Sequence, residues 1–130
     1  GLKPLARILS SAAAGIEPRI MGAGPIEAIK KAVKRAGLTL DDMDIIEINE
    51  AFASQVLSCL KGLDVAFDDP RVNPNGGGIA IGHPLGCSGA RLALTVARQL
   101  QRTGKKYAVI SLCIGLGQGL AMVIENPEAA

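Results

Sequence analysis

Apolar residues recur at helical spacing in three segments of the chain. The first helix opens at Gly24-Pro25, because proline suits the first helical turn, where its missing N–H would have no partner. Gly37 favours the end of this helix, since glycine readily adopts the left-handed conformation of a C′ residue. The second helix follows Asn49, a candidate cap, and the third spans Gly89–Arg102 with Ser88 as its candidate cap. The repeating apolar positions are Ile26, Ile29 and Val33, then Phe52, Val56 and Leu60, then Leu92, Val96 and Leu100.

Shorter apolar runs between the helices predict strands. Leu5–Ala14 and Asp44–Ile48 precede the first two helices, and Ile79–Ile81 lies within a glycine-dense stretch. Tyr107–Cys113 and Leu120–Glu125 are separated by a short glycine-rich connection suited to an antiparallel hairpin. The order β-α-β-α-(β)-α-β-β predicts an α/β domain over residues 1–130, with a mixed sheet and no internal linker.

The composition excludes several classes of function. Aromatic residues make up 2% of the chain, which leaves no stacking platform for single-stranded nucleic acid. The formal net charge of +2, spread along the chain, gives too weak a field to argue for nucleic acid or an anionic membrane as a partner. No apolar run approaches the roughly 18 residues of a membrane helix, and the N-terminal segment lacks the apolar core of a signal peptide.

The three cysteines lack CxxC spacing and are interpreted as thiols of a reducing compartment, so a cytoplasmic location is expected. Each reduced thiol is therefore a candidate for chemistry.

The chain begins at Gly1 rather than Met, which favours a processed chain, a trimmed chain or a piece of a longer protein.

Reactive side chains fall in three segments that also have backbone freedom. Asn49 stands at a strand-to-helix junction, where capping is the ordinary role of an asparagine. His83, the only histidine, lies in a loop flanked by glycines that let a ligand approach, although an isolated histidine is more often structural. Cys113 ends an apolar strand beside a glycine turn whose N–H groups could converge on an oxyanion. Its alternative role is that of a small core residue.

Two familiar site types are not supported by these segments. The glycines at 115, 117 and 119 are followed by a strand rather than a helix, so the context of a dinucleotide-binding turn is missing. His83 and Cys87 have no further ligand cluster, and no metal site is expected. Cys87, near a helix N-terminus, remains a candidate activated thiol.

Taken together, the motifs resemble the C-terminal domain of thiolases, the acyl-CoA acyltransferases. The matching runs stand in the family's order and at its spacing: Asn49-Glu-Ala-Phe52, Asn73–Arg91 and Cys113–Gly119, preceded by Ile20-Met-Gly-Ala-Gly-Pro25. The resemblance implies a subunit of two similar β-α-β-α-β-β halves, each with a five-stranded mixed sheet, of which this chain is one. The family's nucleophilic cysteine belongs to the N-terminal half, which this chain does not contain.

The resemblance also implies the reaction and its residues. A cysteine thioester forms from acyl-CoA, and a 3-oxoacyl-CoA is cleaved or condensed, with CoA and acyl-CoA as substrates and no cofactor. His83 would activate the nucleophile and help stabilise the enolate, and Asn49 would position a water at that oxyanion site. Cys113 would move the α-proton or protonate the departing enolate, and the N–H of Gly115 would serve the oxyanion hole of the thioester intermediates. Phe52 would form an apolar wall near the acyl and pantetheine groups.

Several narrower expectations follow from the resemblance. Asp68–Asn75 is most similar to the 3-oxoadipyl-CoA thiolases of aromatic degradation, with a general acetyl-CoA acetyltransferase as the other reading. The expected partners are the missing N-terminal domain and, in the intact enzyme, further copies of the subunit. Gly78 and Leu116 depart from the family, which commonly has alanine at the first position and glycine or a small residue at the second. The rival interpretations are a silent assembly or binding domain, and a hydrolase using Cys87 or Cys113 with His83.

Two structural expectations complete the hypothesis. His83, Asn49 and Cys113 should lie within about 10 Å of one another at one edge of the sheet, with Gly115 facing the same cavity and Cys59 outside it. The helix Gly89–Arg102 should form the central layer of the subunit, and the apolar area it exposes would mark the missing half.

Overall fold

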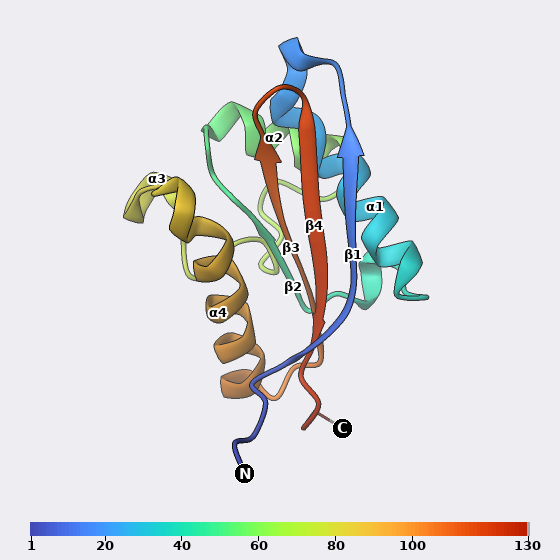
Figure 1. The fold of residues 1–130 in the computed structure, drawn as a ribbon, viewed down its shortest axis with the longest axis vertical. Coiled ribbons are helices and arrows are strands. Elements are labelled where there is room, and N and C mark those ends of the chain that lie inside the picture. Colours follow the sequence, from blue (N-terminus) through green and yellow to red (C-terminus); the bar gives the residue numbers. More distant parts are fainter. Residues whose placement is uncertain (130) are drawn as a thin grey trace.

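The computed structural model describes residues 1–129, in which four strands form one mixed sheet with helices on both faces (Figure 1). The strand order is β1-β4-β3-β2. The last two strands form the predicted hairpin, β1 adds to it antiparallel, and β2 adds parallel on the other side. The strands are β1 (Arg7–Gly15), β2 (Ile45–Ile48), β3 (Tyr107–Ile114) and β4 (Gln118–Glu125).

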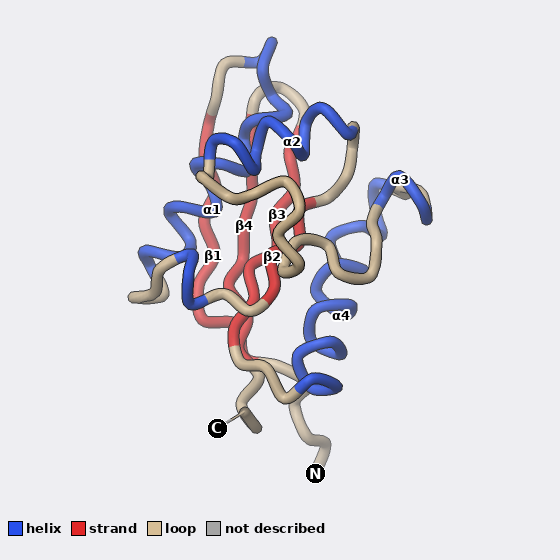
Figure 2. Tube along the Cα trace, turned by 180° about the vertical axis from the view of Figure 1, so that it is seen from behind, coloured by secondary structure: helices blue, strands red, loops and turns tan. Residues whose placement is uncertain are grey.

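Figure 2 shows α1 and α2 on one face of the sheet, whereas α4 lies on the other. The helices are α1 (Gly24–Arg35), α2 (Ala53–Gly62), α3 (Gly78–Ile81) and α4 (Leu85–Thr103), with short 3-10 turns η1 (Pro18–Ala23) and η2 (Leu40–Asp42). As predicted, Pro25 lies in the first turn of α1, and Gly37 follows its end with a φ of 72°. The N-terminus and the segment after β4 lie at the end of the molecule away from α3 (Figure 1), where Lys3 forms an ion pair with Glu128.

Strand alternation divides the buried side chains into two cores. The larger core lies under α1 and α2 and includes Ile46, Ile48, Val109 and Val123 from the sheet. The smaller core contains the three predicted apolar residues of α4 together with Ile45, Ala108, Ile110 and Ile124. The helical faces predicted for α1 and α4 are therefore the faces that pack.

The expected five-stranded sheet has four strands, and the predicted strand Ile79–Ile81 is part of the short helix α3. In place of a fifth strand, Val72 forms one parallel bridge with Ile46 at the outer edge of β2. Pro70 and Pro74 flank this bridge. Because proline has no N–H to donate, a ladder cannot extend regularly past either residue.

Two predicted helix starts are also wrong. Helix α2 begins at Ala53 with Phe52 as its N-cap, so Asn49 caps nothing. Helix α4 begins at Leu85 after Pro84, and Ser88 lies inside its first turns instead of capping it. In both cases the polar side chain contacts another part of the chain, which local sequence does not reveal.

Helix α4 leaves part of its face of the sheet open. It packs mainly on β3 and less closely on β2 and β4, and β1 lies beyond these strands (Figure 1). A hollow of about 130 Å³ with almost wholly apolar walls lies between α4 and the strands β3 and β4. It is lined by Gly89, Ala93, Ile110, Leu112, Leu120, Ala121 and Met122. The predicted apolar face of α4 is itself buried, and the exposed large apolar side chains are spread over strands, helices and loops, with Leu85 and Leu94 of α4 among them. No helix within residues 1–129 is both long and apolar enough to cross a membrane.

Candidate active site

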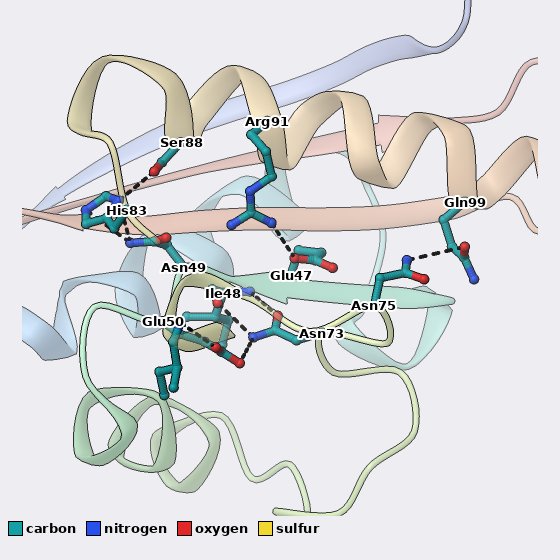
Figure 3. Close-up of polar contacts among 11 residues, drawn as sticks. Glu47, Ile48, Asn49, Glu50, Asn73, Asn75, His83, Ser88, Arg91 and Gln99 are labelled. Atoms are coloured by element: carbon teal, nitrogen blue, oxygen red, sulfur yellow. Dashed lines mark hydrogen bonds and ion pairs between the residues drawn. The ribbon is translucent and has the colours of Figure 1, made fainter. Parts of the chain in front are cut away.

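Asn49 follows the last residue of β2, and its N–H donates to the carbonyl of Ser111 on β3 at 2.9 Å. The side chain is fully buried and turns toward the face that carries α4. Its amide nitrogen Nδ2 lies 3.3 Å from Nε2 and 3.5 Å from Nδ1 of His83 (Figure 3). The structure thus brings together two of the predicted site residues, which are separated by more than a whole helix along the chain.

His83 is placed by a tight connection between α3 and α4. Gly82 has a φ of 88°, a left-handed conformation that favours glycine, and Pro84 is the N-cap of α4. The ring nitrogen Nδ1 lies 2.5 Å from Oγ of Ser88, which is buried in the first turns of α4. Ser88 was predicted only as a helix cap, so its contact with the histidine was missed.

The turn that carries Asn49 is held by Asn73. The Asn73 amide Nδ2 donates to the carbonyl of Ile48, and its Oδ1 accepts from the N–H of the same residue, both at 2.9 Å. One side-chain amide thus replaces the peptide group that a fifth strand would supply. The same Nδ2 donates to Glu50 Oε1 at 3.2 Å, and Glu50 Oε2 accepts from the N–H of Ile79 in α3. These contacts hold α3 at the end of β2. They therefore also fix the position of His83, which follows α3 in the chain.

Gly77 stands where the chain passes Glu50 closely. A Cβ at this position would lie 2.6 Å from the Glu50 carboxyl carbon, closer than real Cβ contacts come. At the next position, Gly78, a Cβ would lie 2.9 Å from the backbone oxygen of Glu50. The departure from the family's alanine at Gly78 thus accompanies a close approach of α3 to the Asn49–Glu50 turn.

A buried ion pair connects β2 to α4 beside this site. Glu47 is 1% exposed, and Nη1 of Arg91 lies 3.8 Å from its Oε2 (Figure 3). Neither carboxylate oxygen has a hydrogen-bond partner within residues 1–129. Burial raises the pKa of Glu47 to about 7, with Arg91 opposing the shift and Glu50 adding to it.

We expect Glu47→Gln to flatten the pH dependence of stability. Because the folded-state pKa of about 7 exceeds the ordinary value of 4.5, the native state holds an extra proton between these limits. Stability from this group is fully present below the lower limit and is lost as pH rises through the upper one, by about 3 kcal/mol in all. Urea unfolding at a series of pH values measures this slope, and Glu27→Gln on the exposed surface of α1 is the control. Equal slopes in wild type and Glu47→Gln would contradict the assignment.

Cys113 lies near the end of β3, two residues beyond the carbonyl that accepts from Asn49. Neighbouring strands are about 4.8 Å apart, so these two backbones are close. Strand alternation, however, turns Cys113 to the face of Val109 and Ser111, toward α1 and α2. The proximity of its thiol to His83 therefore stays a prediction.

The environment of Cys113 differs from the one expected for a base. Burial raises the pKa of its thiol, whereas a thiolate base needs a lowered pKa. The protonated thiol is thus the form this environment favours. Cys59 lies on the same side of the sheet, where its thiol donates to the carbonyl of Gly22 at 3.3 Å and burial raises its pKa to about 11. It is a core residue of α2.

The remaining predicted residues lie on open surface. Gly115 is in the turn between β3 and β4, where its carbonyl accepts from the Gln118 amide at 3.2 Å. The next residue, Leu116, has a φ of 66° and is 88% exposed, which explains why glycine suits that position better. Phe52 is 66% exposed, and Cys87 is an exposed thiol. These groups need a covering surface before they can enclose a substrate.

A larger hollow, of about 440 Å³, lies on the other side of the Asn49–Glu50 turn. Its walls come from α2, α3 and the loop before Asn73: Glu50, Ala53, Val56, Leu57, Leu60, Phe67, Asp68, Asp69, Val72, Asn73 and Ile79. Neither His83 nor Cys113 lines it. We therefore place the candidate site at the Asn49–His83 contact and not in this hollow.

Comparison with known proteins identifies the family of the chain. The family model described as "Thiolase, C-terminal domain" matches residues 2–126. A "Beta-ketoadipyl-CoA thiolase" from Acinetobacter baylyi is 61% identical over 125 residues, which cover 96% of this chain and 31% of the relative. A "3-oxoadipyl-CoA/3-oxo-5,6-dehydrosuberyl-CoA thiolase" from Escherichia coli is 56% identical over 126 residues, covering 97% of this chain and 31% of the relative.

Solved structures give the same result. Human mitochondrial 3-ketoacyl-CoA thiolase superposes with a TM-score of 0.92 at 52% identity, covering 95% of this chain and 31% of that protein. The chain thus spans about 31% of the length of the relatives it matches. Because the family model covers nearly every described residue, the chain belongs to the thiolase family, in which it is the C-terminal domain.

Proposed function

We propose that this chain supplies the acid/base and oxyanion groups of an acyl-CoA C-acyltransferase that cleaves 3-oxoacyl-CoA with CoA, or runs the reverse Claisen condensation. The observation that carries the proposal is the contact between Asn49 and His83 at the end of β2. The contact supports the proposal because it pairs an imidazole with a side-chain amide at the end of β2. The nucleophilic cysteine lies outside this chain.

The four groups have different proposed roles, which follow from the chemistry of each. The imidazole of His83 takes the proton of the nucleophilic thiol and then donates toward the enolate oxygen. The buried amide of Asn49 positions a water at the same oxygen. Cys113, whose pKa is raised by burial, acts as the acid that protonates the departing enolate. The backbone N–H of Gly115 completes an oxyanion hole.

The partner that completes the site is the N-terminal thiolase domain. The apolar hollow beside α4 and the open face of β4 provide a surface that such a domain would cover. Exposed Phe52 then becomes an apolar wall of the acyl site. We further propose that the intact enzyme is a cytoplasmic homo-oligomer.

The substrate we propose is a 3-oxoadipyl-CoA-like acyl-CoA of aromatic degradation. The names of the relatives at 61% and 56% identity support this choice over a general acetyl-CoA acetyltransferase. A dicarboxylic acyl chain requires a cationic partner, which the N-terminal domain would have to supply or share.

A chimera tests the proposal, with this chain replacing the matching C-terminal segment of the Acinetobacter baylyi relative. The isolated chain is expected to give no turnover of acetoacetyl-CoA or 3-oxoadipyl-CoA with CoA, because no acyl-enzyme can form without the nucleophile. The chimera is expected to cleave 3-oxoadipyl-CoA. The junction lies near Gly1, at the end of the molecule away from α3 (Figure 1).

Two results would contradict the proposal. Turnover by the isolated chain would indicate that Cys87 or Cys113 acts as its own nucleophile. A chimera that assembles normally, as judged by native mass spectrometry, yet has no thiolase activity would favour a silent assembly domain.

A further inference from the structure

The hydrogen-bond arrangement around Ser88 determines where the histidine carries its proton. Oγ of Ser88 lies 2.5 Å from Nδ1 of His83 and 3.2 Å from the carbonyl of Pro84, to which its hydroxyl donates. A serine hydroxyl has one hydrogen, so with that hydrogen on Pro84 its oxygen can only accept from the ring. The hydrogen in the short contact must then belong to Nδ1.

The other neighbour of the ring does not decide this question. Nδ2 of Asn49 is 3.3 Å from one ring nitrogen and 3.5 Å from the other, which is not the geometry of an in-line bond to either. Asn49 thus limits the position of the imidazole but accepts no proton from it through this nitrogen. Ser88 is the neighbour that distinguishes Nδ1 from Nε2.

We propose that Ser88 is a positioning residue that holds His83 in the tautomer with hydrogen on Nδ1 and leaves the lone pair on Nε2. The consequence rests on the proposed function. The proton of the nucleophilic thiol passes to Nε2, which leaves a thiolate and an imidazolium. The new Nε2–H is then the donor available to an enolate oxygen, and the same proton returns when the thiol re-forms.

A bond from a helical serine to the carbonyl four residues earlier is ordinary in itself. Here it has a second effect, because it fixes the hydroxyl hydrogen and turns the oxygen lone pair toward the ring. Ser88 is 1% exposed, so water does not compete with His83 and Pro84 for its hydroxyl. Selection of one tautomer requires a buried hydroxyl that donates its hydrogen to one partner and accepts a hydrogen bond from the ring.

The test uses nitrogen-15 NMR of this chain, in which His83 is the only histidine and needs no assignment. At a pH where the imidazole is neutral, a protonated-type signal is expected from Nδ1 and an unprotonated-type signal from Nε2. The opposite pattern, with hydrogen on Nε2, would overturn the proposal. This readout needs no turnover, so an inactive chimera with the expected tautomer would refute the proposed function and leave this inference standing.

Variants separate positioning from simple stabilisation of the helix. In Ser88→Ala the two ring signals are expected to move toward each other, because nothing then holds hydrogen at Nδ1. Ser88→Thr, which keeps a hydroxyl, should restore the wild-type pattern, and Ser58→Ala on the exposed side of α2 should leave it unchanged. If Ser88→Ala does not fold, the spectra of the wild type and of Ser88→Thr still show which ring nitrogen carries the hydrogen. A folded Ser88→Ala with the wild-type pattern would show that Ser88 does not select the tautomer.

Discussion

His83→Ala in the chimera is expected to lower kcat for 3-oxoacyl-CoA thiolysis by about a hundredfold to ten-thousandfold, the range that one positioned acid/base contributes. The imidazole is the group placed to take the thiol proton, and alanine leaves the thiol largely protonated. Cys113→Ser should cause a loss in the same range, because a serine hydroxyl is a far weaker acid than a thiol. Steady-state kinetics with 3-oxoadipyl-CoA and CoA measure both effects.

Cys87→Ala provides the matched control, since Cys87 is an exposed thiol in the first turn of α4, a few residues after His83. It should retain the activity of the unmodified chimera. A Cys113→Ser chimera with full activity would remove the second thiol from the mechanism. Loss of activity in Cys87→Ala alone would instead support the hydrolase-like reading, in which that thiol pairs with His83.

Asn73→Ala is expected to lower the free energy of unfolding of the chain by about 3 kcal/mol, because a buried donor and a buried acceptor lose their partner together. Both belong to Ile48, which is fully buried at the end of β2. Asn73 also has a φ of 42°, a conformation that alanine tolerates less well than asparagine. Urea denaturation followed by circular dichroism gives the change.

Asn75→Ala is the control for this prediction. Exposed Asn75 lies two residues further along the same loop, and its amide donates to the side chain of half-buried Gln99 at 3.3 Å. Its loss should change stability by less than about 0.5 kcal/mol, as is usual for a surface position. Similar effects of the two substitutions would mean that Asn73 does not act as the missing peptide group of the sheet.

Local sequence was enough to predict the elements whose packing faces are local. The apolar repeats of α1 and α4 and the hairpin of β3 and β4 occur where their spacing indicates. Helix starts were less predictable, because Asn49 and Ser88 had an ordinary local role as caps. In the fold both side chains contact His83 instead. The two helices begin at Ala53 and Leu85.

The site residues that belong to a sequence motif could be predicted. The contacts between residues that are distant in the sequence could not. Asn49 and His83 are singled out by their motifs, and the fold brings them into contact. Nothing in the sequence indicates that Glu47 pairs with Arg91 across two elements, or that Asn73 completes β2. Such contacts depend on the register of strands and helices in space, which a one-dimensional pattern does not contain.

The strand order β1-β4-β3-β2 has a consequence for how the chain is made. β1 pairs only with β4, and β2 gains its main partner only from β3, so both wait for the hairpin that is synthesised last. When β1, α1, β2 and α2 have emerged from the ribosome, β3 and β4 have not yet been made. The two emerged strands therefore have no neighbouring strand with which to form hydrogen bonds. Those strands remain unpaired until β3 and β4 have emerged, a period in which exposed edges invite aggregation or chaperone binding. Removing β4 from the C-terminus would for the same reason leave β1 at the other end of the chain without a neighbour.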